Sequence, residues 1–137
     1  MLTNWVQDAG LQVISIGKVA DIFSMQGINK SYKGSDAQLM KVLANQVNTA
    51  DEGSFVFANF VEFDSLFGHR RDVAGYAKAL EGFDDEIGRI LPNLRENDLM
   101  IFTADHGNDP TWIGTNHTRE RVPVLCSSNS EVSLGHI

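Results

Sequence analysis

The sequence has a single cysteine and no long apolar run, and each of these shortages excludes a class of protein. It contains one cysteine, Cys126, so no internal disulfide can form, and this composition fits a reducing compartment. No apolar stretch approaches the roughly 20 residues that span a bilayer. The N-terminal stretch MLTNWVQDAG has neither the basic flank nor the apolar core of a signal peptide. We therefore expect a cytoplasmic protein.

Positive charge is also scarce. Lys and Arg total 11 against 18 Asp and Glu, which gives a formal net charge of −7. Nucleic acids and membrane surfaces attract basic patches, so this balance argues against both as partners. Hydrophobic residues make up 42% and charged residues 21% of the 137 residues, as in a globular domain with its own core.

Apolar runs predict four strands. Residues 12–16 and 98–104 are β-prone, and residues 122–127 form a last short strand. The run SFVFANFV, residues 54–61, is almost continuously apolar, which is typical of a strand covered on both faces in a parallel sheet.

Two helices are predicted between the strands. Ser35 and Gln38 have the spacing of a capping box, and apolar residues recur every fourth position after them, at Leu39, Leu43 and Val47. A second helix begins after Asp72, with an apolar face of Tyr76, Leu80, Phe83, Ile87 and Leu91. Together with the strands, they predict an α/β fold with a mainly parallel sheet flanked by helices.

Side chains that bind metals gather next to the predicted strands. In a parallel sheet, ligands bind at the carboxyl ends of the strands, and five such side chains fall on strand-end loops: Asp64, His69, Asp105, His106 and His117. Taken singly, each aspartate is more often a cap or turn residue and each histidine a hydrogen-bonded loop residue. The combined pattern favours a metal-binding site. Aspartate and histidine without a thiolate suit Mn²⁺ or Zn²⁺ better than Ca²⁺. Five ligands exceed the needs of one catalytic ion, which makes two ions plausible, as in phosphoryl-transfer sites.

The motifs EFDSLFGHRRD and FTADHGNDPTWIGTNHTRE resemble those of the phosphopentomutase family, in the alkaline phosphatase superfamily. TADHGN alone would also admit the cofactor-independent phosphoglycerate mutases, whereas GHRRD and the DPTW to HTRE stretch together favour phosphopentomutase. The resemblance runs through essentially the whole chain but corresponds to about the C-terminal third of a family member. We therefore expect residues 1–137 to be the C-terminal portion of the metal-binding α/β core, without the N-terminal core segment and the cap domain.

The resemblance implies a set of roles. Asp64, His69 and His117 would hold one Mn²⁺, and Asp105 with His106 would hold the second. The nucleophile, a phosphorylated threonine, and a further aspartate ligand would come from the N-terminal part of the family. The implied reaction interconverts ribose 1-phosphate and ribose 5-phosphate, or the deoxyribose equivalents, so the partner would be a pentose phosphate.

Basic residues near these motifs have open roles. Lys18, in the family-like segment IGKVADIF, is either a contact to the phosphoryl group or a solvated side chain. Arg70 and Arg71 could contact phosphate, although pairing with Asp72 or Glu120 is favoured. Asn116 stands where the family usually has an aspartate. The asparagine keeps a hydrogen bond but lacks the negative charge.

Two alternatives stay open at this point. The chain could be a non-catalytic metal-binding fragment, without mutase turnover alone and binding one ion better than two. It could also belong to another phosphatase or phosphomutase of the same superfamily. The sequence ends at SLGHI, where an α/β sheet usually has a further helix, so we expect a truncated chain. The sequence predicts no particular oligomeric state.

Overall fold

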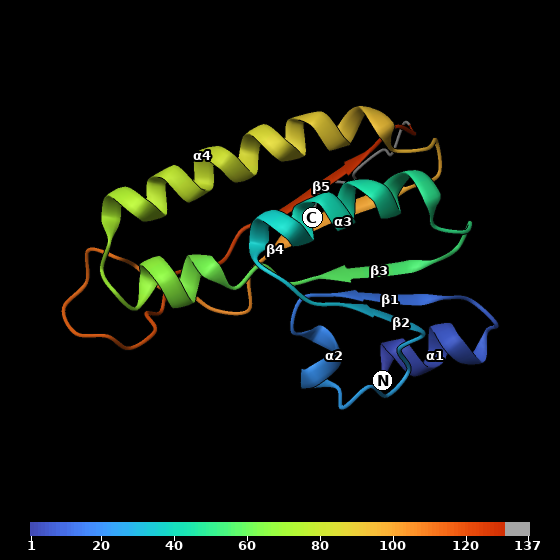
Figure 1. Cartoon of the computed structure of the whole chain (residues 1–137), viewed down its shortest axis with the longest axis horizontal. Helices are drawn as coiled ribbons and strands as arrows, with labels where there is room; N and C mark the ends of the chain where they lie inside the picture. Colours follow the sequence, from blue (N-terminus) through green and yellow to red (C-terminus); the bar gives the residue numbers. More distant parts are fainter. Residues whose placement is uncertain (131–137) are drawn as a thin grey trace. The chain divides into compact units, whose positions relative to one another are not determined.

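Two sheets organise the protein, one in each of two units. The computed structural model describes residues 1–130, and the chain divides into Met1–Glu62 and Phe63–Ile137 (Figure 1). Within residues 1–130, no helix has the length and apolar character needed to cross a membrane.

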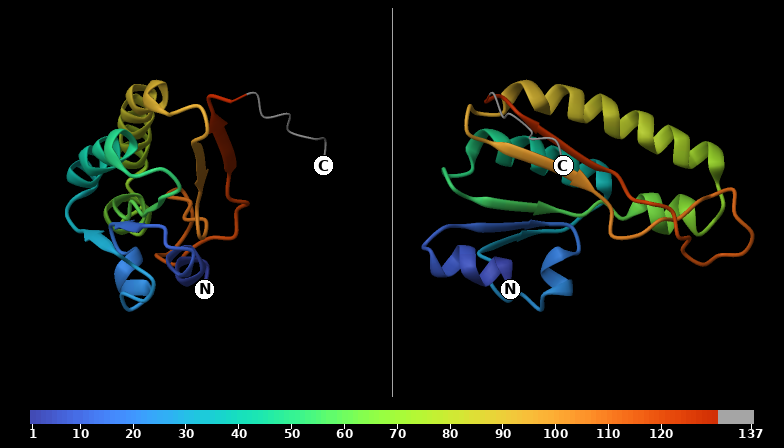
Figure 2. Two further views of the ribbon diagram at one scale, coloured as in Figure 1. Left: turned by 90° about the vertical axis from the view of Figure 1, so that its right-hand side faces the viewer. Right: turned by 180° about the vertical axis from the view of Figure 1, so that it is seen from behind.

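The first unit contains a three-stranded parallel sheet in the order β2-β1-β3. Its elements are α1 (Leu2–Asp8), β1 (Val13–Ile16), α2 (Val19–Ile22), β2 (Lys30–Tyr32), α3 (Asp36–Thr49) and β3 (Phe55–Ala58). Within this unit, α1 and α2 lie on one face of the sheet and α3 on the other (Figures 1 and 2). The predicted parallel sheet with flanking helices is thereby confirmed, whereas α1, α2 and β2 were not predicted.

The core of this unit is built on β1. All four residues of the strand are buried, because the central strand of a sheet with helices on both faces has no solvent side. Val13 packs in a cluster with Ala20 and Ile28. From α3, Leu39 and Leu43 are buried as their spacing predicts. The strand β3 is only half-buried, and Phe57 is 39% exposed, so the expectation that this run is covered on both faces is wrong.

The start of α3 is fixed by polar contacts at both sides. The predicted capping box of Ser35 and Gln38 is present. Asp36 accepts hydrogen bonds from the backbone N–H groups of Val61 (3.2 Å) and Glu62 (2.8 Å). Burial raises the pKa of the Asp36 carboxyl, partly offset by these hydrogen bonds. The chain that leaves β3 is therefore tied to the first turn of α3.

The second unit contains a π-helix, a long α-helix and a two-stranded sheet. Its elements are η1 (Phe63–Gly68), α4 (Val73–Ile90), the 3₁₀ turn η2 (Leu91–Asn93), β4 (Leu99–Thr103) and β5 (Val124–Ser128). As predicted, Asp72 begins α4, with its Oδ1 accepting from the backbone N–H of Gly75 at 2.9 Å. On α4 the predicted apolar face is wrong at Leu80, which is 49% exposed, whereas Ile87 and Ile90 are buried.

The β4–β5 pair departs from the parallel arrangement. The two strands are antiparallel, with Thr103 opposite Val124. A parallel pair requires a crossover, usually a helix, and residues 104–123 contain none. The same antiparallel approach continues into the connecting loop, where Gly107 forms an isolated bridge with Thr118.

We predict that Gly17→Ala destabilises the first unit more than Gly10→Ala does. Both glycines have positive φ, 87° and 79°, so both substitutions carry the left-handed backbone cost of about 1–2 kcal/mol. A Cβ on Gly17 would also lie 2.2 Å from the Asn59 carbonyl oxygen, whereas nothing lies within 4 Å of one on Gly10. We expect Gly17→Ala to lose a further 1–3 kcal/mol, approximately, in urea unfolding. Equal losses in the two variants would contradict this close backbone approach.

Candidate metal centre

The loop between β4 and β5 and the π-helix η1 bring four of the five predicted ligands together. Asp64 lies in η1 and His69 directly follows it. His106 follows β4, and the backbone N–H of Thr118 donates to the Gly107 carbonyl oxygen at 3.0 Å. Because this bridge places residues 106 and 117 side by side, the imidazole rings of His106 and His117 stack with centroids 3.7 Å apart and planes 20° from parallel.

Ligand atoms of three side chains form a compact triangle, in which the two histidines approach different oxygens of Asp64. The Nε2 atom of His69 lies 3.2 Å from Asp64 Oδ2 and 3.2 Å from His117 Nε2, and His117 Nε2 lies 3.3 Å from Asp64 Oδ1. An ion with bonds of about 2.0–2.2 Å at angles of about 90–110° holds its ligand atoms about 2.8–3.6 Å apart. The three side chains therefore fit one divalent ion.

Hydrogen bonding alone satisfies this triangle less well. A neutral His117 has at most one Nε2 hydrogen, yet an oxygen of Asp64 and Nε2 of His69 both lie within 3.3 Å of that atom. A cation at the centre of the triangle would interact favourably with all three side chains. The donor set of one carboxylate and two imidazoles suits a transition-metal ion or Zn²⁺.

A backbone carbonyl orients His69. Its Nδ1 lies 2.5 Å from the carbonyl oxygen of Thr115. A carbonyl oxygen can only accept, so Nδ1 carries the hydrogen and the lone pair of a neutral ring is on Nε2. That is the atom that faces Asp64 and His117.

Asn108 holds Asp64 and was missed from the sequence. It is buried, 9% exposed, and its Nδ2 donates to Asp64 Oδ1 at 2.6 Å. Its Oδ1 accepts from the Nη1 of Arg71 at 2.6 Å. Arg71 can only donate and an ionised carboxylate can only accept, so the amide has one possible orientation. The signal that could have found Asn108 is its position two residues after His106.

Asp105 is placed differently from the other four residues. Its side chain is 78% exposed, and its Oδ1 lies 3.7 Å from His106 Nε2. Ligand atoms of Asp64, His106 and His117 lie within 4.8 Å of one another. His106 thus lies against the first predicted ligand set, with Asp105 at its solvent side. Their roles as ligands of two separate ions stay a prediction.

The electrostatics of the surroundings follow from burial and hydrogen bonding. Burial raises the pKa of Tyr76, and the negative charge of Asp64 raises it further. Hydrogen bonds from Thr111 lower the pKa of Asp109, and the charge of Arg71 adds to this effect. The expected pairing of Arg71 with Asp72 or Glu120 is not what forms, because its guanidinium donates to neutral oxygens, mainly of the β4–β5 loop.

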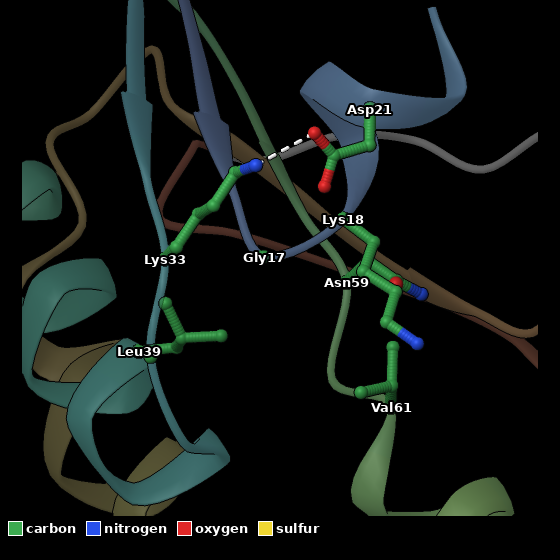
Figure 3. A pocket seen from close by; sticks show the side chains of 8 residues that line it. Gly17, Lys18, Asp21, Lys33, Leu39, Asn59 and Val61 are labelled. Atoms are coloured by element: carbon green, nitrogen blue, oxygen red, sulfur yellow. Dashed lines mark hydrogen bonds and ion pairs between the residues drawn. The ribbon is translucent and has the colours of Figure 1, made fainter.

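Lys18, for which a phosphate contact and a solvated side chain were both open, lines a pocket within the first unit. The pocket, about 220 Å³, lies at the carboxyl ends of the strands β1, β2 and β3. Figure 3 shows Lys18 beside Asn59 and Val61, whereas Lys33 extends to Asp21, with its Nζ 2.7 Å from Asp21 Oδ1. Lys18 is thus available to a ligand in this pocket, and Lys33 is already paired.

The chain matches a known family of proteins over nearly its whole length. Residues 3–135 match the Metalloenzyme superfamily. The chain belongs to the Metalloenzyme superfamily. This superfamily implies bound divalent metal, in agreement with the triangle of Asp64, His69 and His117.

Individual relatives in the superfamily carry a more specific name. A phosphopentomutase of Shewanella frigidimarina is 54% identical over 121 residues, which cover 88% of this chain and 30% of the relative. Phosphopentomutases of a Chelativorans species and of Helicobacter pylori are 54% and 52% identical over 90% and 91% of this chain. The resemblance inferred from the two motifs is thereby confirmed. The chain spans only about 30% of the length of these relatives.

We predict that Gly68→Ala detaches Asn108 from Asp64. A Cβ on Gly68 would lie 2.5 Å from Asn108 Nδ2, so the amide has to move. We expect a loss of about 1–3 kcal/mol in unfolding free energy and a shifted Asn108 side-chain amide signal in NMR spectra. Gly82→Ala is the control, because nothing lies within 4 Å of its Cβ position in α4 and the substitution should stabilise the helix by about 0.5–1 kcal/mol. An unshifted Asn108 signal in Gly68→Ala would contradict the packing described.

Proposed function

We propose that this chain carries the metal-binding part of a phosphopentomutase, which interconverts (deoxy)ribose 1-phosphate and (deoxy)ribose 5-phosphate. The observation that carries the proposal is the triangle of the Asp64, His69 and His117 side chains, whose nearest ligand atoms lie 3.2–3.3 Å apart. The names of the relatives supply the reaction class. The activity is proposed for the whole protein, since the chain spans about 30% of those relatives.

We propose Mn²⁺ as the metal and two ions as the full complement. Asp64, His69 and His117 would hold the first ion, and Asp105 with His106 would contribute to the second. Divalent ions at such a site offset the charge of a transferring phosphoryl group and orient its oxygens. The high exposure of Asp105 supports a weaker second site in this chain.

The chain's own residues prepare the site in three ways. The Thr115 carbonyl oxygen keeps the hydrogen of His69 on Nδ1, which leaves Nε2 free to bind. Asn108 holds Asp64 by its side-chain amide, and this neutral contact preserves the negative charge of the carboxylate. Lys18 is proposed as a point-charge contact to the phosphate of the substrate, supported by its place at a pocket on the strand ends.

We further propose a cytoplasmic location and a small-molecule partner. The net charge of −7 and the single cysteine support this assignment over a nucleic-acid or membrane-surface role.

We predict one tight Mn²⁺ site in the purified chain, measured by titration calorimetry or by the electron paramagnetic resonance signal of free Mn²⁺. Removing one of three ligands by His69→Ala or His117→Ala should weaken binding by at least about 100-fold, more than the loss of an outer hydrogen bond does. Asp105→Ala should change this affinity less than about threefold, because its side chain lies at the solvent edge.

We predict that the whole protein containing this sequence interconverts ribose 1-phosphate and ribose 5-phosphate with Mn²⁺, and that His69→Ala abolishes the conversion. A coupled assay for ribose 5-phosphate measures it. Hydrolysis to free ribose without isomerisation would replace the mutase assignment by that of a phosphatase. If His69→Ala turned over as fast as the wild type, the triangle of Asp64, His69 and His117 would have no role in the reaction.

A further inference from the structure

Arg71 is the most connected side chain around the candidate metal centre. It follows η1 at position 71, and five acceptors lie within hydrogen-bond distance of its guanidinium. Three of them, Gly68 O, Asn108 Oδ1 and Asp109 O, lie 2.6–3.1 Å from Nη1 and share its two hydrogens. Its Nη2 donates to Asn116 O at 2.6 Å and its Nε donates to Gly114 O. All five acceptors are neutral oxygens, so none of these hydrogen bonds of Arg71 goes to a carboxylate.

The backbone of Arg71 is also unusual. Its φ of 56° lies in the left-handed region, which residues other than glycine adopt at a cost in free energy. Such a residue persists only where its surroundings compensate for it, and such residues concentrate at functional sites. The hydrogen bonds of the guanidinium provide that compensation, and they also hold the groups to which they are made in place.

The contacts of Arg71 lead to two metal ligands by separate routes. Through Asn108, whose Nδ2 donates to Asp64 Oδ1, Arg71 orients the carboxylate. Through the carbonyl oxygens of Gly114 and Asn116, it fixes the backbone on both sides of Thr115. The Thr115 carbonyl oxygen in turn holds the Nδ1 of His69.

We propose that Arg71 is the positioning residue of the metal centre, aligning Asp64 through Asn108 and His69 through Thr115. This inference rests on the proposed metal binding. A lysine could not take its place, because one ammonium group cannot present donors in a plane to acceptors spread over five residues. In this role Arg71 acts through the ligands that it aligns and not by direct contact with the ion.

The test compares Mn²⁺ affinity in Arg71→Lys and Arg70→Lys. Both keep the positive charge, and Arg71→Lys also keeps the left-handed backbone cost. Arg70 is exposed and adjacent, so it is the matched control. We expect Arg71→Lys to weaken Mn²⁺ binding about 10- to 100-fold, as loss of a partner that orients a ligand does. We expect Arg70→Lys to change it less than about twofold.

A second variant, Asn108→Ala, tests the route to Asp64 without altering residue 71. It should also weaken Mn²⁺ binding, and Arg71→Lys should have a smaller effect in the Asn108→Ala background than in the wild type. Urea unfolding of each metal-free variant gives the folded fraction. Affinity is then compared at equal folded protein, a measurement that a purely stabilising residue would leave unchanged.

The outcomes separate this inference from the proposed function. If His69→Ala weakens Mn²⁺ binding but Arg71→Lys does not, the positioning role is overturned and the metal site stands. If the effects of Arg71→Lys and Asn108→Ala multiply, the route through Asn108 is overturned. If the wild-type chain binds no Mn²⁺, the metal site and the positioning role fall together.

Discussion

The antiparallel bridge between Gly107 and Thr118 is the constraint on which the rest of the candidate metal centre depends. It continues the pairing of β4 and β5 beyond the strands and brings His106 and His117 into a stack at 3.7 Å. Without it, residues 106 and 117 would not be paired, and His117 would be placed mainly by the contacts of Arg71 with Gly114 and Asn116. Gly107 makes the approach possible, since a Cβ there would lie 3.0 Å from the Thr118 carbonyl oxygen.

The second requirement is that the ligands be held without neutralising them. A metal site needs a charged carboxylate and imidazole nitrogens with free lone pairs. When no ion is bound, these groups attract protons instead. Neutral groups meet this need here: an amide at Asp64 and a backbone carbonyl oxygen at His69. A positive side chain in direct contact with Asp64 would compete with the ion for the same oxygens. Arg71 stands one residue further out, with Asn108 between it and the carboxylate.

Much of the local structure was predictable because its causes are local. The capping box at Ser35 and the side-chain cap at Asp72 are short-range hydrogen bonds, and both helices begin where these residues predict. The strand β2 was missed because the short segment at Lys30–Tyr32 is mostly polar and exposed, so no hydrophobic pattern marks it. The π-helix η1 was missed for a related reason, since its short sequence has no pattern that distinguishes it from a loop.

Four of the five predicted ligand residues lie together, although one step of the reasoning that grouped them was wrong. A parallel sheet was expected to gather the ends of all strands, but His117 precedes β5, and in a parallel pair it would lie at the opposite edge from Asp105 and His106. The antiparallel direction of β5 is what brings the start of one strand to the end of the other. The contacts that orient the ligands, at Asn108, Thr115 and Arg71, could not be predicted, because they join residues up to 46 positions apart. Side-chain identity marks the candidate ligands in the sequence, whereas strand direction decides whether they meet, and contacts such as that of the Thr115 carbonyl oxygen decide which atom His69 presents.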